Sequence, residues 1–316
     1  MRIVVVGTGS AGSRHAAIAR ELLPDADITV VRTVEDLTPA PVDIGVVASP
    51  STTHAREIDL LRAMGAHLLI EKPLAAQSAQ ARDTVGSAAA SGAIELVGYN
   101  LRFTESLQTL RTELLSGTIG RPLTVRCSTG QWLPEWRPDA DYRNGVTAQR
   151  SLGGGVLLEL SHEFDYLTWL FGLPAWVMAN VARVGDLEID VEDAADVLLG
   201  YETSSGPSIG SVSLDMVRRN GGRECTVIGE LGTLRWDAVA GTVDLFDGAT
   251  REWKEISRTD GDVAASYTSE WRHFLDCVNG EAKPLITLQD ALSTLDIVDA
   301  CRVSSDEGRR VEVTTS

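Results

Sequence analysis

Six residues near the start of the chain have the types and spacing of a phosphate-binding turn. They lie between the apolar run Ile3–Val6 and a helical segment that reaches Ala19. The turn consists of Gly7, Thr8, Gly9, Ser10, Ala11 and Gly12. Such glycines permit a tight bend, a close backbone approach to a pyrophosphate and close packing of helix on strand, while free amides at the helix start hold the phosphate charge. The alternative is a structural turn without a ligand, but the position between strand and helix predicts dinucleotide binding.

A lysine stands where another buried strand is expected to end. Glu71, Lys72 and Pro73 come at the end of the run HLLIE, and the proline disfavours helical geometry at the lysine. Ligands of parallel α/β sheets bind outside the carboxyl ends of the strands. We therefore expect Lys72 over the nicotinamide end of a cofactor cleft, with Glu71 beside the cofactor. The alternative is an ordinary solvated surface lysine.

The third candidate group is His162, in the segment Gly153–Gly172. If this segment is one helix, it has a core stripe of apolar residues three and four positions apart. The stripe consists of Leu157, Leu160, Phe164, Leu167 and Phe171. His162 lies on the opposite face, which mixes carboxylates with aromatic residues and which we expect to line a cleft. Two alternatives remain: a helix packed on both faces, or a helix that begins after an N-cap at Ser161 and leaves Glu159 on a preceding strand or turn.

Two further strand ends supply candidate cofactor contacts. Twenty residues after Gly12, where an acid commonly binds the ribose diol of NAD, the chain has Arg32 followed by Thr33. A guanidinium attracts a 2′-phosphate, so the sequence favours NADP over NAD, against the alternative of a solvated arginine. Small polar residues after the next strand are also expected to line the cleft. These are Ser49, Pro50, Ser51 and His54, and the histidine has a second interpretation as a plain residue of a first helical turn.

Polar residues also follow the last strand of this series, and a long polar segment comes later in the chain. Asn100 is predicted to contact the cofactor and Arg102 the substrate. The segment 131–150 contributes candidate substrate contacts at Trp132, Trp136, Tyr142 and Arg143. Aromatic faces stack on sugar rings and arginines bind carboxylates or phosphates. The alternative is that the two tryptophans anchor the loop to the core.

The elements that must position these residues follow an alternating order. Short β-branched runs at 3–6, 28–31, 44–48, 67–71 and 94–98 are separated by helical segments, among them 53–64 and 78–90. This order predicts a parallel sheet covered on both faces. Between the second and third runs there is room for one helical turn, with Thr33 and Asp36 as its capping box.

After about Phe103 the pattern changes from alternation to a succession of strands. A helix over 105–115 precedes strands at 123–128, 176–184, 195–201, 208–214, 225–228 and 242–246, which indicate an open antiparallel sheet. Two helices close the chain, one ending at Asn279–Gly280 and one starting at the capping box of Thr287 and Asp290. The sequence thus predicts an α/β protein with a doubly wound Rossmann domain over 1–119. A second, α+β domain with a large open, mostly antiparallel sheet is expected over 120–316, and the last helix is expected to be able to pack back on the first domain.

These motifs together resemble the glucose–fructose oxidoreductase, inositol dehydrogenase and rhizopine catabolism (Gfo/Idh/MocA) family over essentially the whole chain. The resemblance rests on the glycine-rich turn, Ser49-Pro50 with His54, Glu71-Lys72-Pro73, the 98–102 cluster and the glycine-led segment 153–169. It implies a catalytic role for Lys72 and an open sheet often used to form dimers or tetramers. The family pattern has an aspartate four residues before the histidine. This chain has Glu159 three residues before His162, with Glu163 and Asp165 after it.

The chemistry that this resemblance implies is NAD(P)-dependent interconversion of a hydroxyl and a carbonyl on a sugar-like substrate. His162 would move the hydroxyl proton, Lys72 would stabilise the charge on the oxygen, and Glu159 or Asp165 would orient the imidazole. The 131–150 segment resembles loops of members that act on nucleotide-activated or acidic sugars. The alternatives are an NAD-dependent dehydrogenase of free aldoses or inositols, and a non-catalytic dinucleotide sensor.

The composition and charge of the chain disfavour several classes of binding partner. A net charge of −17 over 316 residues disfavours nucleic acid and anionic membranes. No apolar run reaches membrane-spanning length, and the N-terminus does not have the pattern of a signal peptide. The four cysteines lie far apart and form no metal-type pair, so we expect them buried and reduced, no metal, and a cytoplasmic location.

Overall fold

The structure is a computed structural model that describes residues 1–38, 40–88, 92–202 and 206–314. It divides into two compact units: unit 1 comprises 1–99, 151–153 and 268–295, and unit 2 comprises 100–150, 154–267 and 296–316. The division therefore comes at Tyr99/Asn100 rather than at the expected 119/120. The helix that follows packs on strands of unit 2, which explains the difference.

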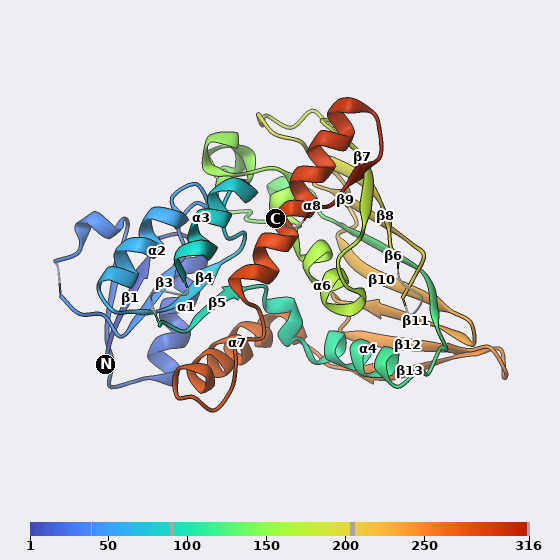
Figure 1. Ribbon diagram of the computed structural model, residues 1–316, viewed down its shortest axis with the longest axis horizontal. Helices are drawn as coiled ribbons and strands as arrows, with labels where there is room; N and C mark the ends of the chain where they lie inside the picture. Colours follow the sequence, from blue (N-terminus) through green and yellow to red (C-terminus); the bar gives the residue numbers. More distant parts are fainter. Residues whose placement is uncertain (39, 89–91, 203–205, 315–316) are drawn as a thin grey trace. The chain divides into compact units, whose positions relative to one another are not determined.

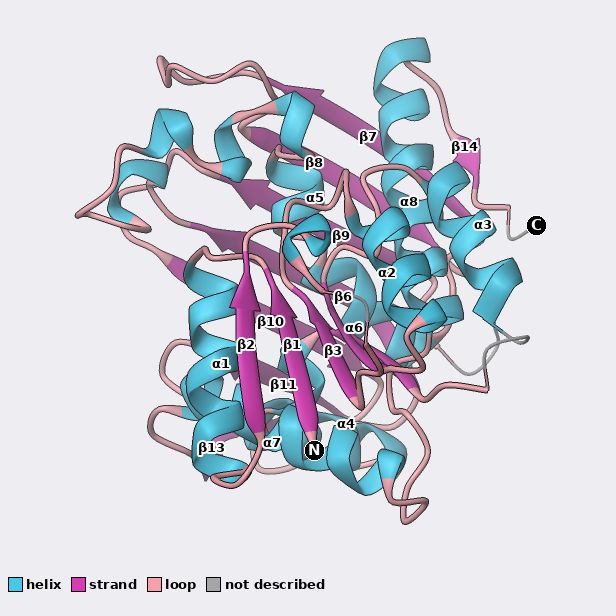
Figure 2. Ribbon diagram, turned by 90° about the vertical axis from the view of Figure 1, so that its left-hand side faces the viewer, coloured by secondary structure: helices cyan, strands magenta, loops and turns pink. Residues whose placement is uncertain are grey.

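Unit 1 contains the predicted parallel sheet. Its strands are β1 (Arg2–Val6), β2 (Asp27–Val31), β3 (Ile44–Val47), β4 (His67–Glu71) and β5 (Glu95–Gly98). They are all parallel, in the order β2-β1-β3-β4-β5, and Figure 2 shows β2, β1 and β3 running in one direction. Their side chains are almost wholly buried in β1, β3 and β5, as expected for strands covered on both faces. The reversal of strand order between β1 and β3 is the place where such sheets bind ligands.

The helices of unit 1 also follow the sequence prediction. They are α1 (Ser10–Leu22), α2 (His54–Ala63) and α3 (Ser78–Ala88). The expected last two residues of the third helix, 89 and 90, lie outside the described residues. The short turn after β2 is a 3-10 helix, η1 (Val34–Asp36), and its capping box forms between Thr33 and Asp36.

Unit 2 is built on a nine-stranded sheet in the order β13-β12-β11-β10-β6-β9-β8-β7-β14 (Figure 1). The strands are β6 (Pro122–Gly130), β7 (Trp176–Ala182), β8 (Ala194–Gly200), β9 (Ile209–Asp215), β10 (Gly222–Gly229), β11 (Gly232–Asp237), β12 (Thr242–Asp247), β13 (Glu252–Arg258) and β14 (Val311–Glu312). The pairing of β6 with β9 is parallel and the other pairings are antiparallel, which confirms a mostly antiparallel sheet.

Three strands of this sheet were not predicted: β11, β13 and β14. The β13 sequence EWKEISR is mainly charged and exposed, and it pairs with β12 alone, so it carries no apolar pattern that a sequence reading could detect. Charges on an edge strand discourage pairing with other chains. The apolar positions of β11 do alternate, since Leu234 and Trp236 are buried, but the run is short.

The remaining helices are α4 (Glu105–Leu115), α5 (Val156–Glu159), α6 (His162–Phe171), α7 (Asp262–Val278) and α8 (Leu288–Glu307). Helix α4 packs on β11, β12 and β13, and α5 on β8 and β9. The predicted capping box at Thr287 and Asp290 forms, and Gly280 ends α7 with φ of 78°. The segment 131–150 contains the 3-10 turns η3 (Leu133–Glu135), η4 (Tyr142–Asn144) and η5 (Val146–Ala148).

All four cysteines are buried and have free thiols, as predicted. Of the helices that the described ranges contain, none combines the length and apolar character needed to span a membrane.

Candidate active site

The glycines of the turn after β1 have three different physical roles. Gly7 has φ of +117°, and a Cβ there would lie 2.3 Å from the carbonyl oxygen of Ala48. A Cβ on Gly12 would lie 1.9 Å from the Gly7 carbonyl oxygen. Both glycines are therefore required by the packing of the protein itself. At Gly9, in contrast, no described atom lies within 4 Å of the Cβ position.

The open space at Gly9 fits a ligand that approaches the backbone. Gly9 is the N-cap of α1, makes no side-chain capping bond, and is exposed together with Thr8 and Ser10. The first turn of α1, which includes Ala11, has no acidic residue. Helix-start amides without a side-chain cap and without nearby negative charge are a suitable site for a pyrophosphate.

Two substitutions should separate the roles of these glycines. Gly9→Ala is expected to raise the dissociation constant for the dinucleotide at least about tenfold while changing the unfolding free energy by less than about 1 kcal/mol. Gly12→Ala, with its 1.9 Å clash, should destabilise the fold by about 3 kcal/mol. Nicotinamide fluorescence titration and denaturant unfolding measure the two effects. Undiminished binding by Gly9→Ala would contradict the assignment.

The residues after β3 divide between structural and ligand-facing positions. The Ser49 hydroxyl is committed to the protein, because it bonds Thr53 Oγ1 at 2.9 Å and also Glu57. His54 is 1% exposed, donates from Nε2 to the Ser49 carbonyl oxygen at 2.9 Å, and has its pKa lowered by burial. The Pro50 carbonyl oxygen accepts from Thr53. His54 is therefore a neutral structural residue. This agrees with its interpretation as an ordinary residue of a first helical turn.

Ser51 differs from its neighbours. Its hydroxyl oxygen is buried and has no hydrogen-bond partner among the described residues. A Cβ on Gly153, also in unit 1, would lie 2.1 Å from that oxygen. A buried hydroxyl without a partner is unfavourable, so Ser51 is a suitable donor or acceptor for a bound cofactor.

The residues after β2 show that Arg32 and Thr33 have unequal roles. Arg32 is exposed directly after the last strand residue, Val31. Thr33 uses both its backbone amide and its hydroxyl to bind Asp36 at 3.3 Å. The polar groups of Thr33 are thus used in the capping box. Arg32, which is exposed, is the better candidate of the two for a ligand contact.

Lys72 follows the last residue of β4 and is half-buried. The peptide bond between Lys72 and Pro73 is cis. The preceding Glu71 does not point to open solvent, because its Oε1 lies 2.9 Å from Nε2 of His15. Burial alone would raise the pKa of Glu71, but the hydrogen bond from His15 and the positive charges of Lys72 and Arg14 outweigh it and hold that pKa below its usual range. Lys72 therefore stands beside a carboxylate.

The segment around His162 is two helices rather than one. Helix α5 ends at Glu159, and α6 begins at His162 with Ser161 as its N-cap residue. The Ser161 hydroxyl turns back to the Leu158 carbonyl oxygen at 2.9 Å instead of capping α6. The expectation of one continuous helix was wrong, and the alternative with Ser161 at the cap and Glu159 before it is confirmed. His162 itself is 7% exposed.

The face of α6 that was expected to line a cleft is buried. Tyr166 is fully buried and packs edge-on against Trp236, with ring centroids 5.4 Å apart. The predicted core stripe on the other face is also buried at Phe164 and Leu167. On the face of His162 and Tyr166, Asp165 is 1% exposed and Trp169 is half-buried, so this face is covered over most of its length.

Arg102 and Asp165 form a buried ion pair. Arg102 donates from Nε and Nη2 to the two Asp165 oxygens, at 2.9 and 2.7 Å, and the side chains are 2% and 1% exposed. The Arg102 guanidinium also lies 5.6 Å from the ring centroid of Trp169. The expected substrate contact at Arg102 is therefore not supported, because its guanidinium is engaged inside unit 2. The ion pair instead connects the first turn of α6, through Asp165, to η2 (Asn100–Phe103), which contains Arg102.

Glu163, for which the sequence predicts no role, is completely buried. Its Oε1 accepts from Thr129 Oγ1 at 2.7 Å and from Arg223 Nε at 2.8 Å, on strands β6 and β10. The first turn of α6, which begins with His162, is thus held by Asp165 on one side and by Glu163 on the other. A carboxylate directly after the histidine was visible in the sequence, but its partners lie 34 and 60 residues away along the chain.

The remaining predicted contacts are also engaged within unit 2. Asn100 is 2% exposed and donates to Ser266 Oγ at 2.7 Å. Arg143 binds Asp141 and Glu188, and the Tyr142 hydroxyl accepts from the backbone amide of Glu188.

The two tryptophans of the 131–150 segment are half-buried. The Trp132 ring is covered by the guanidinium of Arg219, 3.9 Å from the ring centroid. Trp136 donates from Nε1 to the Gln131 carbonyl oxygen at 3.0 Å.

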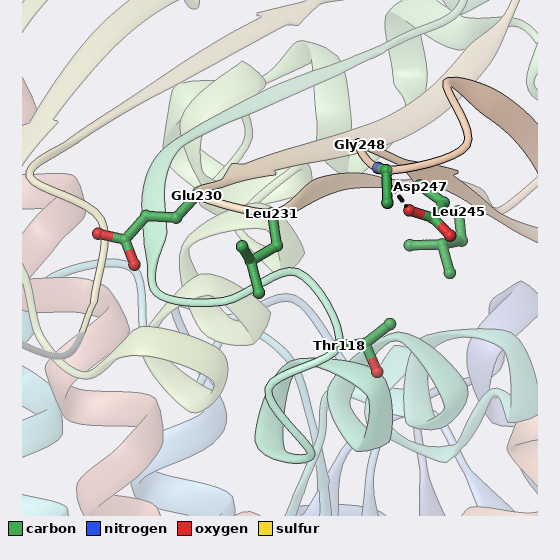
Figure 3. Close-up of a pocket in the computed structure, with 7 residues that line it drawn as sticks. Thr118, Glu230, Leu231, Leu245, Asp247 and Gly248 are labelled. Carbon is green, nitrogen blue, oxygen red and sulfur yellow. Dashed lines mark hydrogen bonds between the residues drawn. The ribbon is translucent and has the colours of Figure 1, made fainter.

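An open hollow of about 540 Å³ lies elsewhere on unit 2 (Figure 3). Thr118 lines it together with two hairpin turns, at Glu230 and Leu231 and at Asp247 and Gly248. None of the predicted catalytic or binding residues lines this hollow.

Comparison with known protein families matches both halves of the chain. Residues 19–99 match the description "Oxidoreductase family, NAD-binding Rossmann fold", and residues 111–313 match "Oxidoreductase family, C-terminal alpha/beta domain". The chain belongs to the Gfo/Idh/MocA oxidoreductase family. This confirms the resemblance that the motifs indicated, and it makes the protein an oxidoreductase with an NAD-binding Rossmann domain.

Curated Gfo/Idh/MocA relatives are similar along almost the whole chain. Inositol 2-dehydrogenase 1 of Saccharopolyspora erythraea is 27% identical, over 99% of this chain and 88% of its own length. The scyllo-inositol 2-dehydrogenase (NADP(+)) IolW of Bacillus subtilis is 23% identical, over 95% of this chain and 86% of its own. Among solved structures, the WlbA dehydrogenase from Bordetella pertussis in complex with NADH and UDP-GlcNAcA has a TM-score of 0.82 and 23% identity, covering 100% of this chain and 98% of its own. The last similarity concerns the fold.

Proposed function

We propose that the protein is an NAD(P)-dependent dehydrogenase or reductase that interconverts a hydroxyl and a carbonyl group on a sugar-like polyol. The observation that carries the proposal is Lys72, a lysine placed beside the carboxylate of Glu71 at the carboxyl end of a parallel strand. The same edge of that sheet carries the turn with open space at Gly9 and the buried hydroxyl of Ser51. Ligands of α/β sheets bind at this edge.

The reaction needs two groups from the protein. Removing hydride from a carbinol carbon requires that its hydroxyl proton leave, since an alkoxide in water is too costly at neutral pH. His162 accepts that proton as general base and returns it in the reverse direction. Lys72 donates a hydrogen bond to the same oxygen and stabilises its developing negative charge. The nicotinamide, when bound, supplies or takes up the hydride.

The carboxylates around His162 have a different role from the one expected. Asp165 is bonded through both oxygens to Arg102, and Glu163 is bonded to Thr129 and Arg223. We propose that these pairs fix the position of the first turn of α6, and with it the backbone of His162. Glu159 ends the preceding helix and remains the candidate for a direct role beside the imidazole.

The contacts of the 131–150 segment favour an uncharged polyol over an anionic sugar. The Arg143 guanidinium is bound by the carboxylates of Asp141 and Glu188, and the Arg150 side chain donates to the Asp190 carbonyl oxygen. Guanidinium groups so engaged have fewer donors left for a substrate carboxylate or phosphate. The two curated relatives described above are named inositol dehydrogenases, which supports the same substrate class.

A two-step assay tests the proposal. Quenching or enhancement of nicotinamide fluorescence on titration of NADH and NADPH measures cofactor binding. A panel of inositols, aldoses and sugar acids, followed at the nicotinamide absorbance band, then measures turnover. We expect turnover of neutral polyols. Tight cofactor binding with no turnover across the panel would favour a dinucleotide sensor and contradict the proposal.

Arg32 is proposed to select NADPH over NADH. Substituting Arg32 by Ser removes a charge-assisted contact to the 2′-phosphate and should lower the ratio of kcat/KM for NADPH to that for NADH roughly ten- to hundredfold. Arg20, an exposed arginine in the last turn of α1, supplies the matched control, because Arg20→Ser should leave the ratio unchanged. If the ratio of kcat/KM for NADPH to that for NADH is equal in wild type and Arg32→Ser, then Arg32 does not contact the 2′-phosphate.

The open sheet of unit 2 is the proposed surface for self-association. Met178 and Leu198 are direct partners on β7 and β8, and both are more than 40% exposed. Leu198 pairs with Ser211 of β9. Ile209 lies two residues before Ser211, on the same face of the sheet, and is 41% exposed. A row of exposed apolar side chains across three strands is typical of an interface. Light scattering of the purified protein tests for a dimer or tetramer.

A further inference from the structure

Three side chains of unit 1 form a buried hydrogen-bonded chain that ends beside Lys72. Trp271, on α7, donates from Nε1 to Nδ1 of His15 at 2.9 Å. Nε2 of His15, on α1, lies 2.9 Å from Oε1 of Glu71, at the end of β4. His15 and Trp271 are fully buried, and the Glu71 side chain is 14% exposed. None of these contacts is used by the reaction proposed above.

The donors and acceptors along this chain follow from elementary chemistry. An indole nitrogen only donates, so Nδ1 of His15 must be the acceptor and carries no proton. A neutral imidazole then has its proton on Nε2, and that proton points at Glu71. An imidazolium is excluded here because both of its nitrogens donate. Trp271 therefore fixes the tautomer of His15, and His15 in turn fixes one oxygen of Glu71 as an acceptor.

The charges around Glu71 show why this bond matters. Lys72 and Arg14 place positive charge near it, and neutral His54 is also close. Glu270, the residue before Trp271, is 1% exposed, and its Oε1 has no hydrogen-bond partner among the described residues. Burial and the nearby Glu71 raise the pKa of Glu270 well above its usual value. The cluster thus holds two carboxyl groups whose pKa values shift in opposite directions, that of Glu71 downward and that of Glu270 upward.

We infer that His15, held by Trp271, is a positioning residue for Lys72: it keeps Glu71 as an oriented carboxylate behind the lysine. The inference rests on the proposed catalytic role of Lys72. It also places the positioning histidine on α1, the helix that follows the phosphate-binding turn. A carboxylate held at this point attracts the ammonium group and limits its motion.

The first test needs no turnover. The side-chain nitrogen NMR spectrum of wild-type protein, labelled with ¹⁵N-histidine, distinguishes the two neutral tautomers and the imidazolium. The chain has five histidines, and loss of one signal in His15→Gln assigns His15. We expect a neutral ring protonated on Nε2. A ring protonated on Nδ1, or doubly protonated at pH 7, would overturn the inference.

The second test follows the acid limb of the kcat profile against pH. Without His15, burial is the dominant influence on Glu71 and its pKa rises, so the carboxylate is lost at a higher pH. His15→Leu should therefore move the acid limb upward by about one pH unit. His15→Gln, whose amide still donates to Glu71, should restore most of the shift. Cofactor affinity should stay within about threefold of wild type in both variants.

Trp271→Phe gives a variant that leaves His15 in place. It removes only the indole donor, so the His15 ring is no longer held in its neutral form protonated on Nε2, and its ¹⁵N signal should move toward the other tautomer or the imidazolium. Trp236→Phe is its matched control: Trp236 is equally buried, in unit 2, and its Nε1 donates to Ser106 Oγ at 2.7 Å. The control should lose comparable stability without any change in the ¹⁵N signal of His15.

The possible failures are distinguishable. An unmoved acid limb in His15→Leu, or an unchanged His15 signal in Trp271→Phe, overturns the positioning role while leaving the proposed function intact. If His15→Leu does not fold, the ¹⁵N-histidine spectrum of the wild type and the Trp271→Phe variant still test the positioning role of His15. Retained turnover after loss of Lys72 would instead contradict the proposed function, whatever the state of His15.

Discussion

Replacing Lys72 by methionine should lower kcat about a thousandfold, the effect of removing one donor to a developing oxyanion together with its charge. Methionine keeps the length of the side chain and removes only the ammonium group. Affinity for the dinucleotide should stay within about threefold of wild type, because the turn at Gly9 and the hydroxyl of Ser51 are unchanged. Single-turnover kinetics and nicotinamide fluorescence measure the two quantities.

The sequence offers a clean control for this experiment. The chain has only three lysines, Lys72, Lys254 and Lys283, and Lys283 is exposed in unit 1. Lys283→Met should leave turnover unchanged. Lys72→Arg should recover part of the loss, since a guanidinium keeps the charge but presents it with a different shape. Near-normal turnover of Lys72→Met would rule out the role assigned to this lysine.

The second large effect is expected on stability. Arg102→Met should reduce the unfolding free energy by about 3–5 kcal/mol, because it leaves the Asp165 carboxylate buried without its bidentate partner. Denaturant unfolding followed by tryptophan fluorescence measures the change. The same variant should lower kcat, since Asp165 belongs to the helical turn that begins with His162.

Two further variants show whether the loss comes from an unpaired buried charge. Arg102→Met combined with Asp165→Leu should recover most of the stability, because apolar replacement of a whole buried pair is often neutral. The exposed pair of Arg121 and Glu230, with side chains 42% and 47% accessible, is the matched comparison. Arg121→Met should cost less than about 1 kcal/mol. A similarly small loss in Arg102→Met would mean that the pair of Arg102 and Asp165 does not anchor α6.

Local chemistry was predictable from the residues alone. The turn at Gly7 to Gly12, the capping box of Thr33 and Asp36 and that of Thr287 and Asp290 all form as expected. In each case the interacting groups lie within six residues of one another, so short-range sterics and hydrogen bonding determine the outcome. The parallel sheet was predictable for a related reason, since strands buried on both faces must be continuous apolar runs.

The predictions that the structure does not support concern polar side chains that have partners elsewhere in the protein. Arg102 and Arg143 were assigned to substrate because free guanidinium groups bind anions. Asp165 lies 63 residues from Arg102, and Glu188 lies 45 residues from Arg143, which also binds Asp141 two residues before it. The helix around His162 was read as continuous because its apolar spacing is regular. The break at Leu160–Ser161 leaves that spacing almost unchanged, which explains why the pattern did not reveal it.

By itself, the sequence determined the phosphate-binding turn, the strand that ends at Lys72 and the family to which the chain belongs. These features depend on residue type and on spacing along the chain. Only the tertiary structure decided which polar groups are paired: Glu71 with His15, His15 with Trp271 across 256 residues, and Asp165 with Arg102. The physical reason is that a buried charge or donor must find a partner, and which partner it finds depends on the packing of distant elements.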